Sequence, residues 1–183
     1  YVRSKTIAER AAWAWHAREG GKLELTTILP GLILGPVWST DYSPSVGFVG
    51  GPLIGVPPGY PRLGFQIVDA RDVAALHVTA MTAPQAAGER FLGTGDFLWQ
   101  RDVGAILRAR FPERRQIPKR TIPDWVMRLT ALREPLARYV LFELGKERRC
   151  PSAKAQRLLG WRTRTAQETI VDTAESLLRG MPP

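Results

Sequence analysis

The sequence is poor in the residues that hold metal ions and disulfides. Among 183 residues it has one cysteine, Cys150, and two histidines, His16 and His77. A single cysteine excludes an internal disulfide and a cysteine-rich metal site, and it suits a reducing, cytoplasmic location. The histidines stand apart without carboxylate partners, so we expect no metal site. We place His16 on a helix surface and His77 facing the core.

Long hydrophobic runs are missing as well. No apolar stretch reaches the ~18 residues that a membrane span needs, and no signal peptide is visible. Acidic residues are few, 17 against 26 Lys and Arg, which gives a formal net charge of +9. The basic residues are spread along the chain and no nucleic-acid motif surrounds them. We therefore expect a solvated, arginine-rich surface, with neither nucleic acid nor a membrane as partner.

What is present is the composition of a globular protein. Hydrophobic residues make up 44% and charged residues 23% of the chain. Both values are near the globular average, so disordered and fibrous classes are unfavoured. The length suits one ordinary domain or one large part of a two-lobed protein.

Helical and strand patterns alternate along the chain. Residues 1–19 contain no proline or glycine and carry apolar residues at helical spacing, before "GG" stops the helix. A β-rich run follows and ends at Pro30, and the Gly- and Pro-rich stretch 35–64 predicts a long loop around at most one short helix. Further strands are expected near 65–69 and 88–93, and further helices near 73–81 with Asp72 as its cap, and near 97–112, 122–132, 134–145, 152–160 and 166–178.

The first residues, "YVRSK", carry the first chemical signal. One helical turn places Tyr1 beside Lys5. A nearby ammonium favours the phenolate, so the pair could exchange a proton with a substrate hydroxyl or carbonyl. The same spacing also occurs on ordinary exposed helix faces, and the pair alone does not decide between the two interpretations.

The surrounding motifs resemble one enzyme family. A Tyr-x-x-x-Lys helix, a Gly turn and a strand ending "LPGLILGP" are followed by "VDARDVAALHVTAM", "GERFLGTGD" and "SAKAQRLLGW" in the same order and at suitable separations. Together they resemble the extended short-chain dehydrogenase/reductases, also called NAD(P)-dependent epimerase/dehydratases. The resemblance covers nearly the whole chain.

The resemblance implies a role for particular residues. Tyr1 resembles the family's general acid/base, and Lys5 the lysine that binds the nicotinamide ribose and lowers the tyrosine pKa. The segment that packs against the nicotinamide of bound NAD or NADP corresponds to Pro30, Gly31, Leu32 and Ile33. The family's Gly-rich phosphate loop and catalytic Ser/Thr precede the tyrosine, and "GTG" at 93–95 does not replace that loop. We therefore expect the C-terminal part of a longer enzyme, inactive by itself.

The strand end also bears on the substrate. "PGLILGP" is apolar throughout, which resembles the dihydroflavonol, cinnamoyl-thioester, aldehyde and 3β-hydroxysteroid oxidoreductases. We expect hydride transfer to or from a carbonyl or secondary alcohol of an apolar small molecule. Candidate pocket walls lie in the 35–64 loop, although core packing would explain each of them as well: Trp38, Tyr42, Phe48 and Ile54.

The expected fold is α/β, the C-terminal part of a Rossmann-type parallel sheet with a small, mainly helical substrate lobe. We place the sheet domain at 1–116 and the lobe at 117–183. Because Trp13 and Trp15 point to different sides of the first helix, a homodimer through Tyr1–Glu19 is a further hypothesis. Three alternatives stay open: a nucleotide-sugar epimerase or dehydratase of the same fold, a non-catalytic cofactor-sensing protein, and, ranked last, a nucleic-acid-binding protein.

Overall fold

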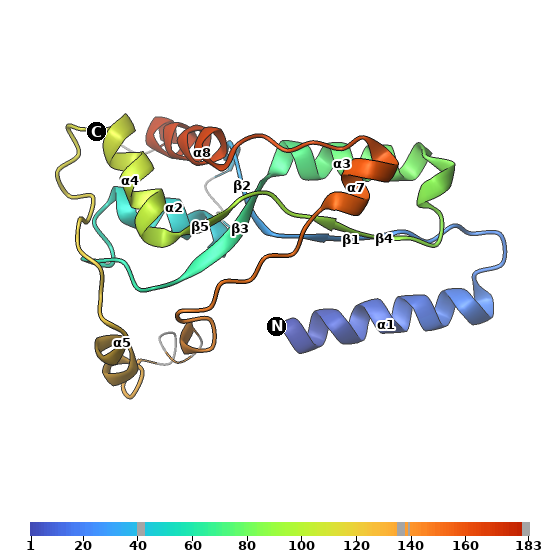
Figure 1. Cartoon of the computed structure of the whole chain (residues 1–183), viewed down its shortest axis with the longest axis horizontal. Coiled ribbons are helices and arrows are strands. Elements are labelled where there is room, and N and C mark those ends of the chain that lie inside the picture. Colours follow the sequence, from blue (N-terminus) through green and yellow to red (C-terminus); the bar gives the residue numbers. More distant parts are fainter. Residues whose placement is uncertain (40–42, 135–137, 139, 181–183) are drawn as a thin grey trace.

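Helices surround two small β-sheets in the computed structural model, which describes residues 1–39, 43–134, 138 and 140–180 (Figure 1). This is the α/β class that the sequence predicts. The strands are β1 (Thr27–Pro30), β2 (Leu32–Leu34), β3 (Gly64–Asp69), β4 (Arg90–Gly93) and β5 (Phe97–Trp99). The helices are α1 (Val2–Glu19), α2 (Gly47–Leu53), α3 (Ala70–Thr82), α4 (Gln100–Arg110), α5 (Asp124–Thr130), α7 (Ala153–Leu159) and α8 (Ala166–Gly180), with short 3-10 turns η1 (Pro44–Val46) and η2 (Pro84–Ala86).

The chain changes strand partner at Gly31. Before it, β1 pairs in parallel with β4, and after it β2 pairs in parallel with β3, which also pairs antiparallel with β5. A Cβ atom on Gly31 would lie 2.4 Å from the backbone oxygen of Gln66 in β3, so the close approach requires glycine here. The two sheets therefore separate at a single residue.

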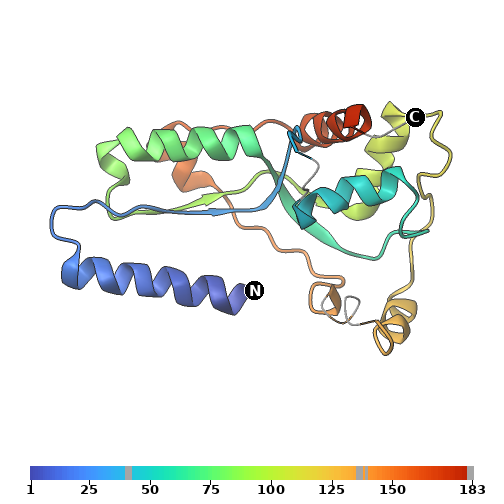
Figure 2. The ribbon, with the colours of Figure 1, turned by 180° about the vertical axis from the view of Figure 1, so that it is seen from behind.

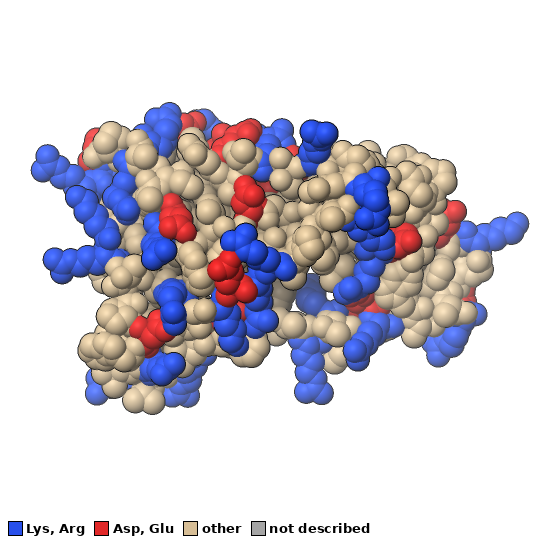
Figure 3. Space-filling model, viewed as in Figure 1, with Lys and Arg blue, Asp and Glu red and all other residues tan. Residues whose placement is uncertain are grey.

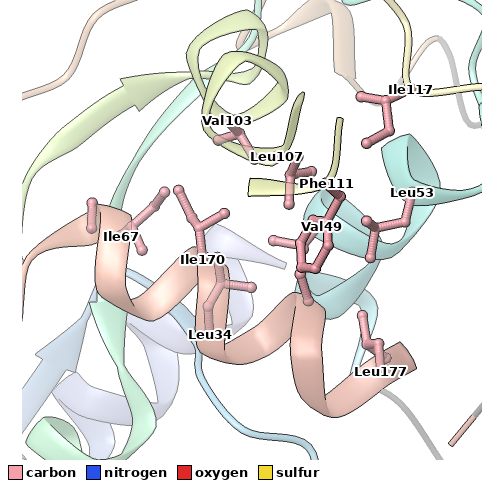
Figure 4. Packing of buried hydrophobic residues seen from close by; sticks show 12 residues of the cluster. Leu34, Val49, Leu53, Ile67, Val103, Leu107, Phe111, Ile117, Ile170 and Leu177 are labelled. Atoms are coloured by element: carbon pink, nitrogen blue, oxygen red, sulfur yellow. The ribbon is translucent and has the colours of Figure 1, made fainter. Parts of the chain in front are cut away.

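Two hydrophobic clusters hold the sheets and helices together. The first joins α2, α4 and α8 to β2 and β3, and its buried side chains point toward one another in Figure 4. The second joins α3 and α7 to β3 and β4 around Phe91 and Trp161. Burying a side chain such as Ile170 or Leu177 contributes roughly 1.5–3 kcal/mol. The division predicted between 116 and 117 stays a prediction, although α7 and α8 pack in clusters that also contain earlier elements.

Helix α1 lies apart from both clusters. It runs beside β1 in the opposite direction, on the other side of the β1/β4 pair from α3 (Figures 1 and 2). None of its residues is buried, and Trp15 is 44% exposed. The apolar stripe that the sequence shows on this helix therefore does not enter the core of the described residues.

The loop of residues 35–64 is anchored on the last helix. Its only described α-helix is α2, preceded by η1, as the sequence predicts. At its start, the amide of Gly35 donates to Thr173 Oγ1 and the amide of Val37 donates to Ser176 Oγ, both at 2.8 Å. Because both hydroxyls belong to α8, the C-terminal helix fixes where the loop leaves β2.

Three local predictions were wrong. Asp69, not Asp72, caps α3, because its carboxylate accepts from the amide of Arg71 at 2.8 Å. Asp72 lies inside the helix and accepts instead from the amide of Arg164 at 2.7 Å. His77 is exposed and its Nδ1 lies 2.8 Å from the carbonyl oxygen of Val73.

The third error concerns residues 97–112. The segment 97–99, expected to begin a helix, forms β5 because it completes a hydrogen-bonded pair with β3. The helix predicted over 134–145 includes residues outside the described ones.

Candidate active site

The predicted proton-transfer pair lies at the free end of α1. Lys5 Nζ is 5.6 Å from the centroid of the Tyr1 ring, and the Lys5 amide donates to the Tyr1 carbonyl oxygen at 3.1 Å. Ser4 Oγ donates to the same oxygen at 2.7 Å. Tyr1 is 78% exposed, so its phenol is accessible. The helix thus brings phenol and ammonium together as the spacing predicts.

An open pocket of about 300 Å³ lies at the carboxyl ends of β1 and β4. Ligands of open α/β sheets bind at this end of the strands. Here the chain changes at Gly31 from pairing with β4 to pairing with β3. The lining is Leu29, Pro30, Gly31, Leu32, Gly64, Phe65, Gln66, Leu92, Thr94, Glu143, Arg148 and Cys150.

One wall of the pocket is a backbone segment held by Gln66 and Thr94. The Cys150 amide donates to Gln66 Oε1, and Thr94 Oγ1 donates to the Cys150 carbonyl oxygen, both at 2.5 Å. Gln66 Nε2 also donates to the Gly95 carbonyl oxygen at 3.0 Å. These bonds join the turn after β4 and the segment before α7 to β3.

A charged pair forms the outer part of the same wall. Arg148 Nε donates to Glu143 Oε2 at 2.9 Å, and both residues line the pocket. Lys146 Nζ lies 3.8 Å from the centroid of the Phe142 ring, which also faces the Arg148 guanidinium at 5.4 Å. The pocket is therefore apolar at the strand ends and charged at this side.

A carboxylate on α1 links the helix to the sheet. Glu9 accepts from Arg90 Nε at 2.6 Å and from Arg90 Nη2 at 2.9 Å, and Thr27 Oγ1 donates to Glu9 Oε1 at 2.9 Å. The hydrogen bond from Arg90 is the main reason that the pKa of Glu9 is lowered to about 2. The carboxylate is thus ionised at neutral pH.

Buried charge elsewhere has a structural explanation. Burial alone would raise the pKa of Asp69, but hydrogen bonds from Arg71 outweigh it and hold this pKa below its ordinary value. Arg71 also pairs with Asp172 of α8 at 2.5 Å. This network joins β3, α3 and α8 and does not line the pocket.

Known proteins with similar sequences are reductases. The ketoreductase adrE of Penicillium rubens is 33% identical over 127 residues, which cover 68% of this chain and 38% of that protein. The NADPH-dependent methylglyoxal reductase GRE2 of Saccharomyces cerevisiae is 29% identical over 187 residues, 98% of this chain and 51% of that protein. The cinnamoyl-CoA reductase 1 of Oryza sativa is 34% identical over 112 residues, 61% of this chain and 32% of that protein.

Solved structures show the same relationship. Yeast methylglyoxal/isovaleraldehyde reductase Gre2, complexed with NADPH, superposes with a TM-score of 0.77 at 26% identity over 98% of this chain and 51% of that one. No family model matches the chain. The chain is a homologue of the extended short-chain dehydrogenase/reductases.

The match is to the C-terminal half of these short-chain dehydrogenase/reductases. The chain spans at most about half the length of the three relatives named above. The resemblance seen in the sequence is therefore confirmed, both for the family and for the half of it that this chain matches.

The other residues predicted to bind ligands lie at different distances from the pocket. Of the predicted nicotinamide-binding residues, Pro30, Gly31 and Leu32 line it, whereas Ile33 packs against the second hydrophobic cluster. Phe48 packs edge-on against the lining residue Phe65, with ring centroids 5.5 Å apart.

The remaining predicted substrate-binding residues do not line the described pocket. Trp38 is 92% exposed and Ile54 is 56% exposed. Tyr42 lies outside the described residues. Their assignment to a short-chain dehydrogenase/reductase substrate pocket stays a prediction.

Sequence reasoning missed Gln66, Arg148, Glu143 and Cys150 as lining residues. Gln66 carries a weak signal, since a polar side chain interrupts the apolar strand "FQIV". For the other three, neither charge nor spacing distinguishes them from the solvated surface.

The surface and the inventory of polar side chains add no further site. Lys and Arg are scattered over the face seen in Figure 3, with Asp and Glu among them. Within the described ranges, no three His, Cys, Asp or Glu side chains come together to hold a metal ion. No helix in that part of the chain is long and apolar enough to cross a membrane.

Proposed function

We propose that this chain is the C-terminal half of an NADPH-dependent reductase that converts a carbonyl group of an apolar small molecule into an alcohol. The observation that carries the proposal is the pocket at the carboxyl ends of β1 and β4, lined by Leu29–Leu32 and lying where the two sheets separate. The preference for NADPH over NADH follows from relatives such as the NADPH-dependent methylglyoxal reductase.

The lining residues fit a flat, uncharged ring. Gly31 has no side chain, and Leu29, Pro30, Leu32 and Leu92 present apolar groups. The nicotinamide would be held against this surface, and NADPH supplies the hydride when bound. In the complete enzyme, Tyr1 would bind the substrate oxygen through its phenol and give its proton to that oxygen as the carbonyl carbon is reduced. Lys5 would favour the phenolate that remains and bind the ribose.

The same proposal includes the substrate walls and the quaternary structure. Phe65, with Phe48 behind it, supplies an aromatic surface beside the pocket, and Trp38, Tyr42 and Ile54 are proposed to complete the wall.

A homodimer would use the exposed apolar side chains of α1, of which Val2 is 70% exposed. The exposed free thiol of Cys150 suits a reducing, cytoplasmic location. The molar mass can be measured by size-exclusion chromatography with light scattering. A monomeric mass at high protein concentration would contradict the dimer.

The decisive experiment is Tyr1→Phe in the full-length polypeptide that contains this chain. General acid/base groups typically contribute 10²–10⁴-fold, so we expect kcat to fall by about that factor while NADPH affinity stays near normal. Tyr60→Phe is the matched control, because Tyr60 is 1% exposed and does not line the pocket. Retained turnover in Tyr1→Phe would refute the role.

A substrate screen distinguishes the proposed reaction from its rivals. Aromatic ketones, aliphatic aldehydes and sterols are compared with UDP- and dTDP-sugars while nicotinamide absorbance is followed. Turnover of nucleotide sugars alone would assign an epimerase or dehydratase of this fold. Cofactor binding without any turnover would assign a cofactor-sensing protein.

A further inference from the structure

The position of α1 is determined by few contacts. No residue of this helix is fully buried, so the helix contributes no side chain to the hydrophobic core of the described residues. Near its carboxyl end, His16 Nε2 lies 2.6 Å from the Leu23 carbonyl oxygen, which fastens the return turn. Glu9, halfway along the helix, accepts hydrogen bonds from residues of the sheet.

Glu9 contacts the amino ends of both strands that form the pocket edge. Arg90 is the first residue of β4 and Thr27 the first of β1. Arg90 binds the carboxylate through two nitrogens, at 2.6 and 2.9 Å, and Thr27 Oγ1 adds a third hydrogen bond at 2.9 Å. A two-point arginine–carboxylate pair fixes orientation as well as distance. The side chain of Glu9 is 18% exposed, so the pair is partly shielded from water.

The spacing along the two elements connects this contact to the pocket. Tyr1 lies eight residues before Glu9, about 12 Å along the helix axis at 1.5 Å per residue. Gly31 lies four residues after Thr27, about 13 Å along the strand at 3.3 Å per residue. Because α1 and β1 run in opposite directions side by side (Figures 1 and 2), both distances lead toward the same end of the molecule. Tyr1 therefore comes level with Gly31 and the pocket.

We propose that Glu9, bound by Arg90 and Thr27, is a positioning residue. It fixes where Tyr1 lies along the axis of α1 relative to the pocket. The inference rests on the proposed reductase function. A misplacement of about 1 Å can cost a reaction about 10²-fold, because the reacting groups no longer meet in a productive geometry. Tyr1 and Lys5 share one helix and move together, so losing the Glu9 contact displaces the pair without changing the distance between its members.

The test uses the full-length enzyme with Glu9→Ala and Glu9→Gln, and Tyr1→Phe as the reference for the proposed function. The matched control is Glu175→Gln, which removes a comparable surface pair, Glu175 with Arg110 at 2.6 Å, neither of which lines the pocket. We expect Glu9→Ala to lower kcat about 10- to 100-fold, with Glu9→Gln intermediate. The pH profile of kcat and the far-UV circular dichroism should change little, the melting temperature should fall by about 2–4 °C, and Glu175→Gln should keep normal kcat.

A charge exchange tests whether the pair itself is responsible. Arg90→Glu alone should lower kcat, because two carboxylates then face each other, and Glu9→Arg combined with Arg90→Glu should restore most of it. Normal kcat in Glu9→Ala, an equal loss in Glu175→Gln, a shifted pH profile or failure of the exchange to restore kcat would each overturn the inference. If Glu9→Ala is normal while Tyr1→Phe is inactive, only the inference fails. If Tyr1→Phe keeps its turnover, the proposed function fails first and the inference with it.

Discussion

Replacing Gly31 by alanine should destabilise the protein at the point where the two sheets separate. The new Cβ would lie 2.4 Å from the Gln66 carbonyl oxygen, whereas real Cβ atoms stay beyond 3.0 Å, so backbone must move by about 0.6 Å. Gln66 belongs to β3, which is paired on both sides, with β2 and with β5. At Gln66, β3 therefore cannot move away from Gly31 without straining its pairing with β5.

The expected cost lies at the upper end of overpacking effects, about 3 kcal/mol. For a domain of this size, 1 kcal/mol shifts the melting temperature by about 2–4 °C, so Gly31→Ala should melt about 6–12 °C lower. Urea unfolding followed by tryptophan fluorescence measures the free energy of unfolding directly. On the proposed reductase function, the same substitution in the full-length polypeptide should also weaken NADPH binding, because Gly31 lines the pocket.

Gly47→Ala is the matched control for this substitution. Gly47 begins α2, and a Cβ atom there would meet nothing within 4 Å. Alanine is favoured over glycine in helices by up to about 1 kcal/mol, so this variant should equal or exceed the wild type in stability. A Gly31→Ala protein that unfolds within about 0.5 kcal/mol of the wild type would refute the packing argument.

Three further outcomes follow from buried and paired polar groups. Asp69→Asn should lower the free energy of unfolding, measured by urea titration, by about 3 kcal/mol. The substitution removes the buried negative charge that pairs with the Arg71 guanidinium. Tyr60→Phe should stabilise the protein by about 1 kcal/mol, since Tyr60 Oη is buried without a hydrogen-bond partner among the described residues, and a lower melting temperature would contradict this. The pKa of Glu9, lowered from 4.5 to about 2, means that its ion pair stabilises the protein above pH 4.5 and that this contribution is lost as the pH falls toward 2. Because Arg90 is 56% exposed and solvent screens the pair, the difference between wild type and Glu9→Gln should be about 1 kcal/mol at neutral pH and should vanish in acid.

Local patterns predicted most of the elements correctly. The first helix and its Gly stop, the strand ending at Pro30, the short helix within 35–64 and the last helix all follow from nearest-neighbour signals: spacing of apolar residues, Gly and Pro positions, and caps. The family and the fold class could be predicted because several such signals occur in one order.

What could not be predicted depends on contacts between distant residues. Residues 97–99 read as the start of a helix, and only the edge of β3 turns them into a strand. The sequence predicts Asp72 as the cap of α3, but it lies inside the helix and accepts from the amide of Arg164, a residue far along the chain that no local pattern marks as its partner. The contact of Glu9 with Arg90 joins residues 81 positions apart, and no local pattern marks it.

The change of pairing partner at Gly31 has a consequence for how the sequence of such a protein can diverge in evolution. The pocket lies where the β1/β4 pair and the β2/β3/β5 sheet diverge, and side chains such as Leu29, Phe65 and Arg148 line the space between them. Substituting these side chains would change which small molecule the pocket binds, while the divergence of the strands would remain. The same fold can thus acquire a new ligand specificity through a few substitutions of pocket-lining residues, provided that Gly31 is kept.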